Sequence, residues 1–307
     1  MFTAKRGRLA LIGAVAVGAV VALAGCASGN PLDTGSSDPA GDTLIVGSQD
    51  YYSNEIIAEI YAQALEANDI TVQRDYRIGQ REVYLPDIEA GKIDVFPEYT
   101  GSLLQAFDEK AAGGTADEIY SQLEAALPTG LRVLDKADAS DQNSWTVTQA
   151  FADKYNLTNL ASLKNVTEPI TVGGNAELET RPFGLNALKE KYGIETAGFK
   201  PIEDGGGPLT VKALVDGDIQ LTNIYTASPN IKTDNLVALE DPDGLFFADN
   251  VVPVVSEKVT DKAASVLNTV SAALTADDLV SLNSESVNDQ KSAEDIAAAW
   301  LKQANLF

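Results

Sequence analysis

The sequence has no histidine and a single cysteine among its 307 residues. Without histidine the chain cannot build a Ser-His-Asp triad, a Cys-His nucleophile pair or a histidine-ligated metal site. One cysteine cannot form an internal disulfide, a Cys-x-x-Cys redox pair or a thiolate zinc site. These absences exclude many kinds of enzyme and metal site, and no cofactor motif is expected.

Positive charge is also scarce, with 22 Lys+Arg against 45 Asp+Glu and a formal net charge of −23. Nucleic-acid binding needs clustered Lys and Arg for phosphate contacts, so this balance argues against it. The hydrophobic fraction of 45% is enough for a sizeable core. The length predicts about two domains.

The N-terminus has the layout of a secretory signal. Lys5, Arg6 and Arg8 precede an uncharged run from Leu9 to Ala22, which is shorter than the ~20 residues of a membrane-spanning helix. The tetrad Leu-Ala-Gly-Cys that ends at Cys26 resembles a bacterial lipobox, whose cysteine is diacylated. We therefore expect a signal peptide at 1–25 and lipidation of Cys26; the alternative is a buried cysteine on an uncleaved anchor.

Cleavage before Cys26 leaves 19 Lys+Arg and 45 Asp+Glu, a net charge of −26. Residues 26–42 are rich in Gly, Ser, Pro and Asp, with Leu32 as their one large apolar residue, which predicts a flexible tether. We expect a folded domain that lipid holds at the outer face of a bacterial cell membrane.

From residue 43 onward, short β-rich runs alternate with amphipathic segments. We predict strands at 43–47, 71–78, 93–96, 170–172 and 219–224, and helices at 54–67, 81–90, 181–191 and 210–215. This order implies mostly parallel sheets flanked by helices. The last stretch, 261–305, is predicted to be mostly helical, with N-caps at Thr275 and Ser292.

The chain resembles itself at an offset of 126 residues. Gly91-Lys-Ile93 falls on Gly217-Asp-Ile219, and Tyr99-Thr100 falls on Tyr225-Thr226. The matches lie where a helix ends, where a strand starts and where that strand ends, which indicates two α/β lobes of similar design. Since ligands bind beyond the carboxyl ends of strands in open α/β sheets, both tyrosines are expected at one cleft.

Two facing tyrosines suggest a cation–π site for a quaternary ammonium group, each ring contributing about 0.5–2 kcal/mol. The alternative is that each tyrosine only ends a strand and packs on a neighbour.

Several segments resemble one family, the substrate-binding components of ABC importers for glycine betaine, choline and carnitine. Its most specific motif is Pro97-Glu-Tyr-Thr-Gly101. The other matching segments are 45–51, 58–66, 78–84, 91–96, 179–185, 209–214, 223–226 and 250–253.

This resemblance implies a two-lobed periplasmic-binding-protein fold of type II that closes by a hinge. Lobe one would comprise 43–141 plus 251–307, and lobe two 142–250. The implied function is capture of a compatible solute and its delivery to a membrane permease, by a monomer without enzymatic activity.

The resemblance also carries over individual site residues. Tyr99 and Tyr225 match the aromatic cage, and Tyr51 matches a position beside the cleft that is usually Phe. Arg181 is suited to a ligand carboxylate because its planar fork can donate two parallel hydrogen bonds; otherwise it is a surface charge at a helix start. The remaining candidates are Thr100, Thr226, Arg81, Gln142, Asn143 and Asn250.

For several residues near these candidates, the sequence leaves both a binding role and a structural role open. Arg81 and Glu82 line the cleft or simply start a helix, and Tyr51 binds solute or packs a loop. Trp145 is a possible further cage ring, whereas Trp300 is predicted to lie in the core.

Two positions depart from the family pattern. Asp249 stands where several relatives have an aromatic residue, and Ala227 follows Tyr225-Thr226 where the family often has Asp. These departures leave the solute open. Two other functions are retained: a sensor or scaffold lipoprotein of the same fold, and an extracellular enzyme that uses carboxylates such as Asp94 and Glu98.

Overall fold

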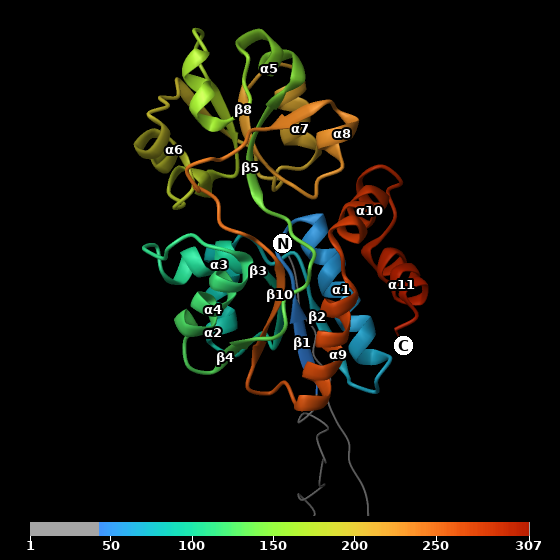
Figure 1. Ribbon diagram of the computed structural model, residues 1–307. Helices are drawn as coiled ribbons and strands as arrows, with labels where there is room; N and C mark the ends of the chain where they lie inside the picture. Colours follow the sequence, from blue (N-terminus) through green and yellow to red (C-terminus); the bar gives the residue numbers. More distant parts are fainter. Residues whose placement is uncertain (1–42, 307) are drawn as a thin grey trace, which may run out of the picture. The chain divides into compact units, whose positions relative to one another are not determined.

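The computed structural model describes residues 43–306, which form two five-stranded sheets with flanking helices (Figure 1). The predicted signal peptide, Cys26 and the tether lie outside the described residues. We refer to the sheet β2-β1-β3-β10-β4 with its helices as lobe one, and to the sheet β7-β6-β8-β5-β9 with its helices as lobe two.

Lobe one is built from both ends of the described chain. Its elements are β1 (Leu44–Gly47), α1 (Tyr52–Glu66), β2 (Val72–Asp75), α2 (Arg81–Glu89), β3 (Val95–Tyr99), α3 (Thr100–Phe107), α4 (Ala116–Ala126) and β4 (Leu131–Val133), followed after lobe two by β10 (Val251–Ser256), α9 (Asp261–Ala273), α10 (Ala276–Val287) and α11 (Ala293–Ala304).

Lobe two is one continuous segment between β4 and β10. Its elements are β5 (Asn143–Thr148), α5 (Gln149–Tyr155), the 3₁₀ turn η1 (Leu160–Asn165), β6 (Thr171–Gly174), the 3₁₀ turn η2 (Ala176–Glu179), α6 (Leu185–Tyr192), β7 (Gly198–Pro201), α7 (Pro208–Val215), β8 (Leu221–Tyr225), α8 (Asn230–Thr233) and β9 (Leu236–Ala238).

The two sheets have the same topology, which is the design that the internal repeat predicts. β2, β1, β3, β10 and β4 correspond in order to β7, β6, β8, β5 and β9. Tyr99 ends β3 and Tyr225 ends β8, so the repeated tyrosines occupy equivalent strand ends.

Each sheet is mostly parallel, as the sequence pattern predicts, and contains one strand that runs in the opposite direction. β1 pairs in parallel with β2 and β3, but β10 runs antiparallel to β3 and β4. Lobe two repeats this arrangement, with β5 antiparallel to β8 and β9. β10 and β5 run against the other strands because each enters its lobe from the other lobe. Local alternation of strands and helices does not reveal this reversed direction.

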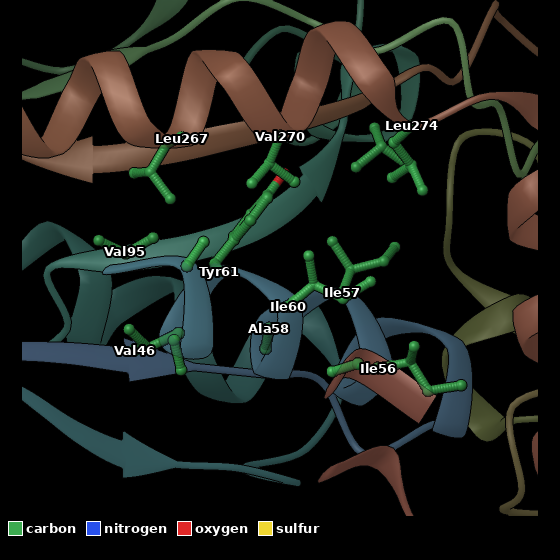
Figure 2. Packing of buried hydrophobic residues seen from close by; sticks show 14 of the residues in the cluster. Val46, Ile56, Ile57, Ala58, Ile60, Tyr61, Val95, Leu267, Val270 and Leu274 are labelled. Carbon is green, nitrogen blue, oxygen red and sulfur yellow. The ribbon is translucent and has the colours of Figure 1, made fainter. Parts of the chain in front are cut away.

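The core of lobe one lies where α1 packs between the sheet and the C-terminal helices. Ile57, Ile60 and Tyr61 on α1 are fully buried. Figure 2 shows Tyr61 pointing toward Val270 of α9, with Val95 and Val46 of the sheet to its left. The apolar stripe predicted for this helix is therefore its contact face.

Two connections join the lobes, and they are paired with each other. Ser140 precedes β5, Asn250 precedes β10, and the two residues form an isolated antiparallel β-bridge. The Ser140 hydroxyl also donates to the Asp249 carbonyl at 3.1 Å. The crossings thus form a short two-stranded ribbon.

The C-terminal helices return to lobe one and also reach lobe two. Thr275 and Ser292 cap α10 and α11 through bonds from the Asp278 and Asp295 amides, as predicted. Asn283 of α10 is buried and donates to the Ala227 carbonyl at 3.1 Å, just beyond β8. Trp300 is buried in the lobe one core, as predicted.

Two element predictions need correction. The helix predicted at 181–191 begins only at Leu185, because Arg181–Gly184 form a turn in which the Gly184 amide donates to the Arg181 carbonyl. The strand predicted at 71–78 ends at Asp75, since Arg77 adopts a left-handed backbone conformation with φ of 55°. Among the described helices, none is long and apolar enough to cross a membrane.

Candidate functional site

Three tyrosines from both lobes meet in one aromatic group. The Tyr51 and Tyr99 hydroxyl oxygens are 2.6 Å apart, and the Tyr51 ring stacks on the Tyr225 ring with centroids 5.0 Å apart and planes at 25°. Tyr52 adds an edge contact to Tyr51 at 5.8 Å. The two repeated tyrosines are therefore joined through Tyr51, for which the sequence left loop packing as an equal alternative.

The backbone dictates where these rings lie. Tyr99 and Tyr225 are the last residues of equivalent strands, and Tyr51 precedes the first turn of α1. Gly205 of lobe two lies against Tyr51: a Cβ there would stand 2.9 Å from the Tyr51 Cβ, and the Gly205 φ is +63°. A side chain at this position would push the lobes apart at the tyrosines.

The tyrosine hydroxyls are tied to a buried carboxylate. Asp141, at the first crossing, accepts a hydrogen bond from the Tyr51 hydroxyl at 3.0 Å and one from the Ala227 amide of lobe two at 2.8 Å. Burial raises the pKa of Asp141 to about 7, although these donors act against the shift. Burial, followed by the charge of Asp141, raises the pKa of Tyr51 well above its usual value, so the tyrosine stays protonated.

Rings in this arrangement leave no room for a cation between them. A cation held between two ring faces needs van der Waals contact on both sides, which separates the ring centroids by roughly 8 Å or more. The Tyr51 and Tyr225 centroids are 5.0 Å apart. The stack must therefore open before a trimethylammonium group can enter between these two rings.

Arg181 makes a contact between the lobes. Its Nε donates to Glu82 at 3.2 Å, and its Nη2 donates to Glu82 at 3.0 Å and to the Gln80 side chain at 2.9 Å. Glu82 and Gln80 lie at the start of α2 in lobe one. Arg181 lies in the turn before α6, and its side chain is only 10% exposed, which does not fit a solvated charge at a helix start.

Arg81 has a structural partner within lobe one. Its Nε and Nη2 donate to the two carboxylate oxygens of Glu98 at 2.9 and 2.8 Å, and the Tyr84 hydroxyl donates to the same carboxylate at 2.6 Å. Arg81 and Glu98 are both buried. This cluster fixes the start of α2 on strand β3.

The other polar candidates at the crossings bond to the chain itself. Thr100 donates to the Ala248 carbonyl and accepts from the Asn250 amide, at 2.9 and 3.1 Å. The Gln142 amide donates to the Thr226 hydroxyl at 2.9 Å, and the Gln142 side chain donates to the Phe247 carbonyl at 2.8 Å. The Asn250 side chain donates to the Ala137 carbonyl. These bonds hold the two crossings to the strand ends.

Asn143 and Trp145 differ in their surroundings although both lie on β5. Asn143 donates to the Ser102 hydroxyl at 3.1 Å, and its Oδ1 is buried without a hydrogen-bond partner. Trp145 is fully buried in the core of lobe two, so the prediction of a further cage ring at this position is wrong.

Asp249, at the position where the family resemblance implies an aromatic residue, joins the return crossing to α3. Its carboxylate accepts from the Ser102 amide at 2.7 Å and from the Ser102 hydroxyl at 2.5 Å, at the N-terminus of α3. Burial raises the pKa of Asp249 to about 6. Exposed amides at a helix N-terminus favour such a carboxylate, which here fastens the return crossing to lobe one.

A cavity of about 340 Å³ lies beside these contacts, with lining from both lobes. Arg81, Glu82 and Ser102 line it from lobe one, and Arg181 and Phe183 line it from lobe two. The tyrosines are not among its lining residues. A larger groove of about 810 Å³ is lined by Gln105, Pro182 and Phe247, among others. Within residues 43–306, no group of three or more acidic, histidine or cysteine side chains is placed to hold a metal ion.

Sequence reasoning missed Asp141, the burial of Asp249 and the partner of Arg181. Asp141 stands just before the predicted crossing, and an isolated acid among small polar residues gives no signal of burial. Glu82 was a candidate only as a neighbour of Arg81, and 99 residues separate it from Arg181.

Comparison with known proteins identifies relatives of the whole domain. Residues 42–303 match the family model described as the substrate binding domain of ABC-type glycine betaine transport system. The glycine betaine-binding protein YehZ of Escherichia coli is 28% identical over 282 residues, covering 86% of this chain and 91% of YehZ. The carnitine transport binding protein OpuCC of Listeria monocytogenes is 22% identical, covering 87% of this chain and 88% of OpuCC.

Two solved structures also match the fold of this chain. The apo structure of YehZ matches with a TM-score of 0.62 at 25% identity, covering 86% of this chain and 99% of that one. The structure of a glycine betaine/carnitine/choline ABC transporter protein matches with a TM-score of 0.69 at 16% identity, covering 86% and 99% of the two chains. At that identity, the second match shows the shared fold.

Proposed function

The chain belongs to the family of substrate-binding domains of ABC-type glycine betaine transport systems, and we propose that it captures a quaternary-ammonium solute between its two lobes for delivery to a membrane permease. The observation that carries this proposal is the aromatic group in which Tyr51 touches both Tyr99 and Tyr225. Quaternary ammonium groups have no N–H to donate, so aromatic ring faces are the surfaces that favour them.

The charges around the tyrosines suit such a solute. Asp141 bonds to the Tyr51 hydroxyl and carries negative charge close to the rings when it is ionised, above its pKa of about 7. Arg181 extends from lobe two toward lobe one and supplies positive charge on the adjacent cavity. We propose that the ammonium group lies against Tyr99, Tyr225 and Tyr51 and that a carboxylate, where the solute has one, lies toward Arg181.

Several candidates from the sequence contribute by shaping this cleft. Our proposal assigns Thr100, Thr226, Gln142 and Asn250 to the crossings, because their side chains bond to backbone groups there. Arg81 holds the start of α2. Asn143 is the one candidate on β5 with a free buried acceptor, its Oδ1.

We propose that the protein binds its solute without transforming it. The carboxylates considered for acid–base chemistry are held by structural contacts: Asp94 accepts from the Ile45 amide and the Ser256 hydroxyl, and Glu98 accepts from Arg81 and Tyr84. We further propose an extracytoplasmic, monomeric protein anchored by lipid on Cys26, on the basis of the lipobox-like sequence.

Isothermal titration calorimetry of the protein with glycine betaine, carnitine, choline and proline betaine tests the solute class. The matched control is 3,3-dimethylbutan-1-ol, which has the shape of choline without its charge. We expect at least one quaternary ammonium solute to bind below the millimolar range and the neutral isostere to bind at least tenfold more weakly than choline. Equal binding of choline and its neutral isostere, or no binding of any solute, would refute the proposal.

A further inference from the structure

The bond between Arg181 and Glu82 spans the cleft in the orientation in which arginine binds carboxylates. Nε and Nη2 of Arg181 face the two carboxylate oxygens of Glu82, at 3.2 and 3.0 Å. This is the planar, two-bond geometry of an arginine fork. The Glu82 side chain therefore occupies the edge of Arg181 that a solute carboxylate would use.

The two partners differ in their access to water. The Arg181 side chain is 10% exposed, whereas the Glu82 side chain is 52% exposed. If the Glu82 side chain turns away while the lobes stay in contact, water can solvate its carboxylate at its half-exposed position, but Arg181 remains largely desolvated and needs another anion. Glu82 is thus the replaceable member of the pair.

The cavity places a solute where this replacement can occur. Both Glu82 and Arg181 line the cavity of about 340 Å³ between the lobes, together with Ser102 and Phe183. A carboxylate that enters the cavity meets the guanidinium of Arg181 and the like charge of Glu82 at the same point. The two carboxylates cannot share the Nε–Nη2 edge, so they compete for it.

We propose that Glu82 is an internal competitor for the solute-binding edge of Arg181 and sets the preference between solutes with and without a carboxylate. It weakens the binding of zwitterions such as glycine betaine, which must displace it, and leaves choline unaffected, since choline has no carboxylate. This inference rests on the proposed function, because it assumes that a quaternary ammonium solute enters the cleft.

The test is calorimetry of the full-length protein and its E82Q variant with glycine betaine and with choline. The substitution keeps the size of the side chain and removes its charge. We expect glycine betaine to bind about two- to fivefold more tightly to E82Q, the range that a half-exposed ion pair supports, and choline to change by less than that. The matched control is E66Q, which removes a half-exposed charge that pairs with Arg74 on lobe one; its affinities should equal those of the wild type.

The outcomes separate this inference from the proposed function. If choline and glycine betaine bind to the wild type but E82Q gains nothing for glycine betaine, the competition is refuted and the proposed function stands. An equal gain for both solutes also refutes it, because the effect would then not involve the carboxylate. If no quaternary ammonium solute binds either protein, the proposed function fails and this inference fails with it.

Hydrogen–deuterium exchange without solute tests the contact itself. In E82Q, amide exchange should be faster than in the wild type in both facing segments, 79–84 of lobe one and 177–184 of lobe two. Each segment loses its partner across the cleft when the Arg181–Glu82 pair is lost. Faster exchange in 79–84 alone would show that Glu82 does not restrain lobe two and would overturn the proposal.

Discussion

Two neighbouring residues at the start of α2, Arg81 and Glu82, take part in arginine–glutamate pairs of opposite character. Arg81 turns inward to Glu98, within lobe one, and both side chains are at most 9% exposed. Glu82 turns outward to Arg181 of lobe two, and its side chain is 52% exposed. The bond lengths are nearly equal, so the difference lies in the surroundings. A pair in which both members are buried maintains the fold. A pair in which one member is half exposed can exchange that member for a ligand.

The largest effect on stability is expected from Glu98→Gln. It leaves the charge of Arg81 buried without its counter-charge, so the free energy of unfolding should fall by about 3–5 kcal/mol. Urea unfolding followed by circular dichroism measures this change. The matched variant Glu82→Gln should cost less than Glu98→Gln, because the Glu82 side chain is 52% exposed, although its partner Arg181 is 10% exposed. Equal losses for the two variants would show that burial does not distinguish the pairs.

The next test asks whether the contacts among the tyrosines, like the Arg181–Glu82 pair, can be exchanged for contacts with a ligand. Tyr99→Ala and Tyr225→Ala should each weaken quaternary-ammonium binding by about 1–3 kcal/mol, since each removes one ring face. The control is Tyr155→Ala, which removes a ring on α5 that packs on Phe151, outside the aromatic group. Calorimetry measures the affinities, and retained cooperative unfolding shows that the fold persists. Unchanged affinity in both variants would contradict the assignment of these rings to the site.

The last test concerns Asp141, which is buried like Glu98 but bonds to both lobes, and which has the smallest expected effect per pH unit. Its pKa is about 7 in the folded protein against an ordinary value of 3.8. The folded state therefore binds more protons between about pH 4 and pH 7, so the free energy of unfolding should fall as the pH rises through this window. The slope for one group is at most about 1.4 kcal/mol per pH unit.

Asp141→Asn should flatten this slope, while the surface variant Asp69→Asn should leave it unchanged. Asp249, whose pKa is about 6, contributes a remaining slope below that pH. Tyr51, Tyr99 and Tyr225, which face Asp141, stay neutral throughout the window. Chemical unfolding at half-unit steps of pH measures the slope; an identical slope in the Asp141 variant would show that this carboxyl is ionised when folded.

Local patterns predicted much of the fold. The stripe of α1, the caps at Thr275 and Ser292, and the repeat that places Tyr99 and Tyr225 at equivalent strand ends all depend on residues close in sequence. Patterns of this kind are set by helix and strand periodicity. The sequence could therefore indicate the lobes and two of the aromatic residues.

What the sequence did not reveal depends on contacts between distant segments. The directions of β5 and β10 follow from the crossings between the lobes, and Arg181 meets Glu82 across 99 residues. The burial of Asp141 arises from Tyr51 and Ala227, which lie on different lobes. No periodicity encodes such pairings, because each partner alone has the pattern of a turn or a helix start.

The bridge between Ser140 and Asn250 has a mechanical consequence. Two separate strands between the lobes would permit torsion as well as bending, but a hydrogen-bonded pair resists torsion and permits bending across its width. If the lobes move relative to each other, we expect the motion to follow mainly this bending direction. The spacing of the two lobes would then vary with a single bending angle at this bridge.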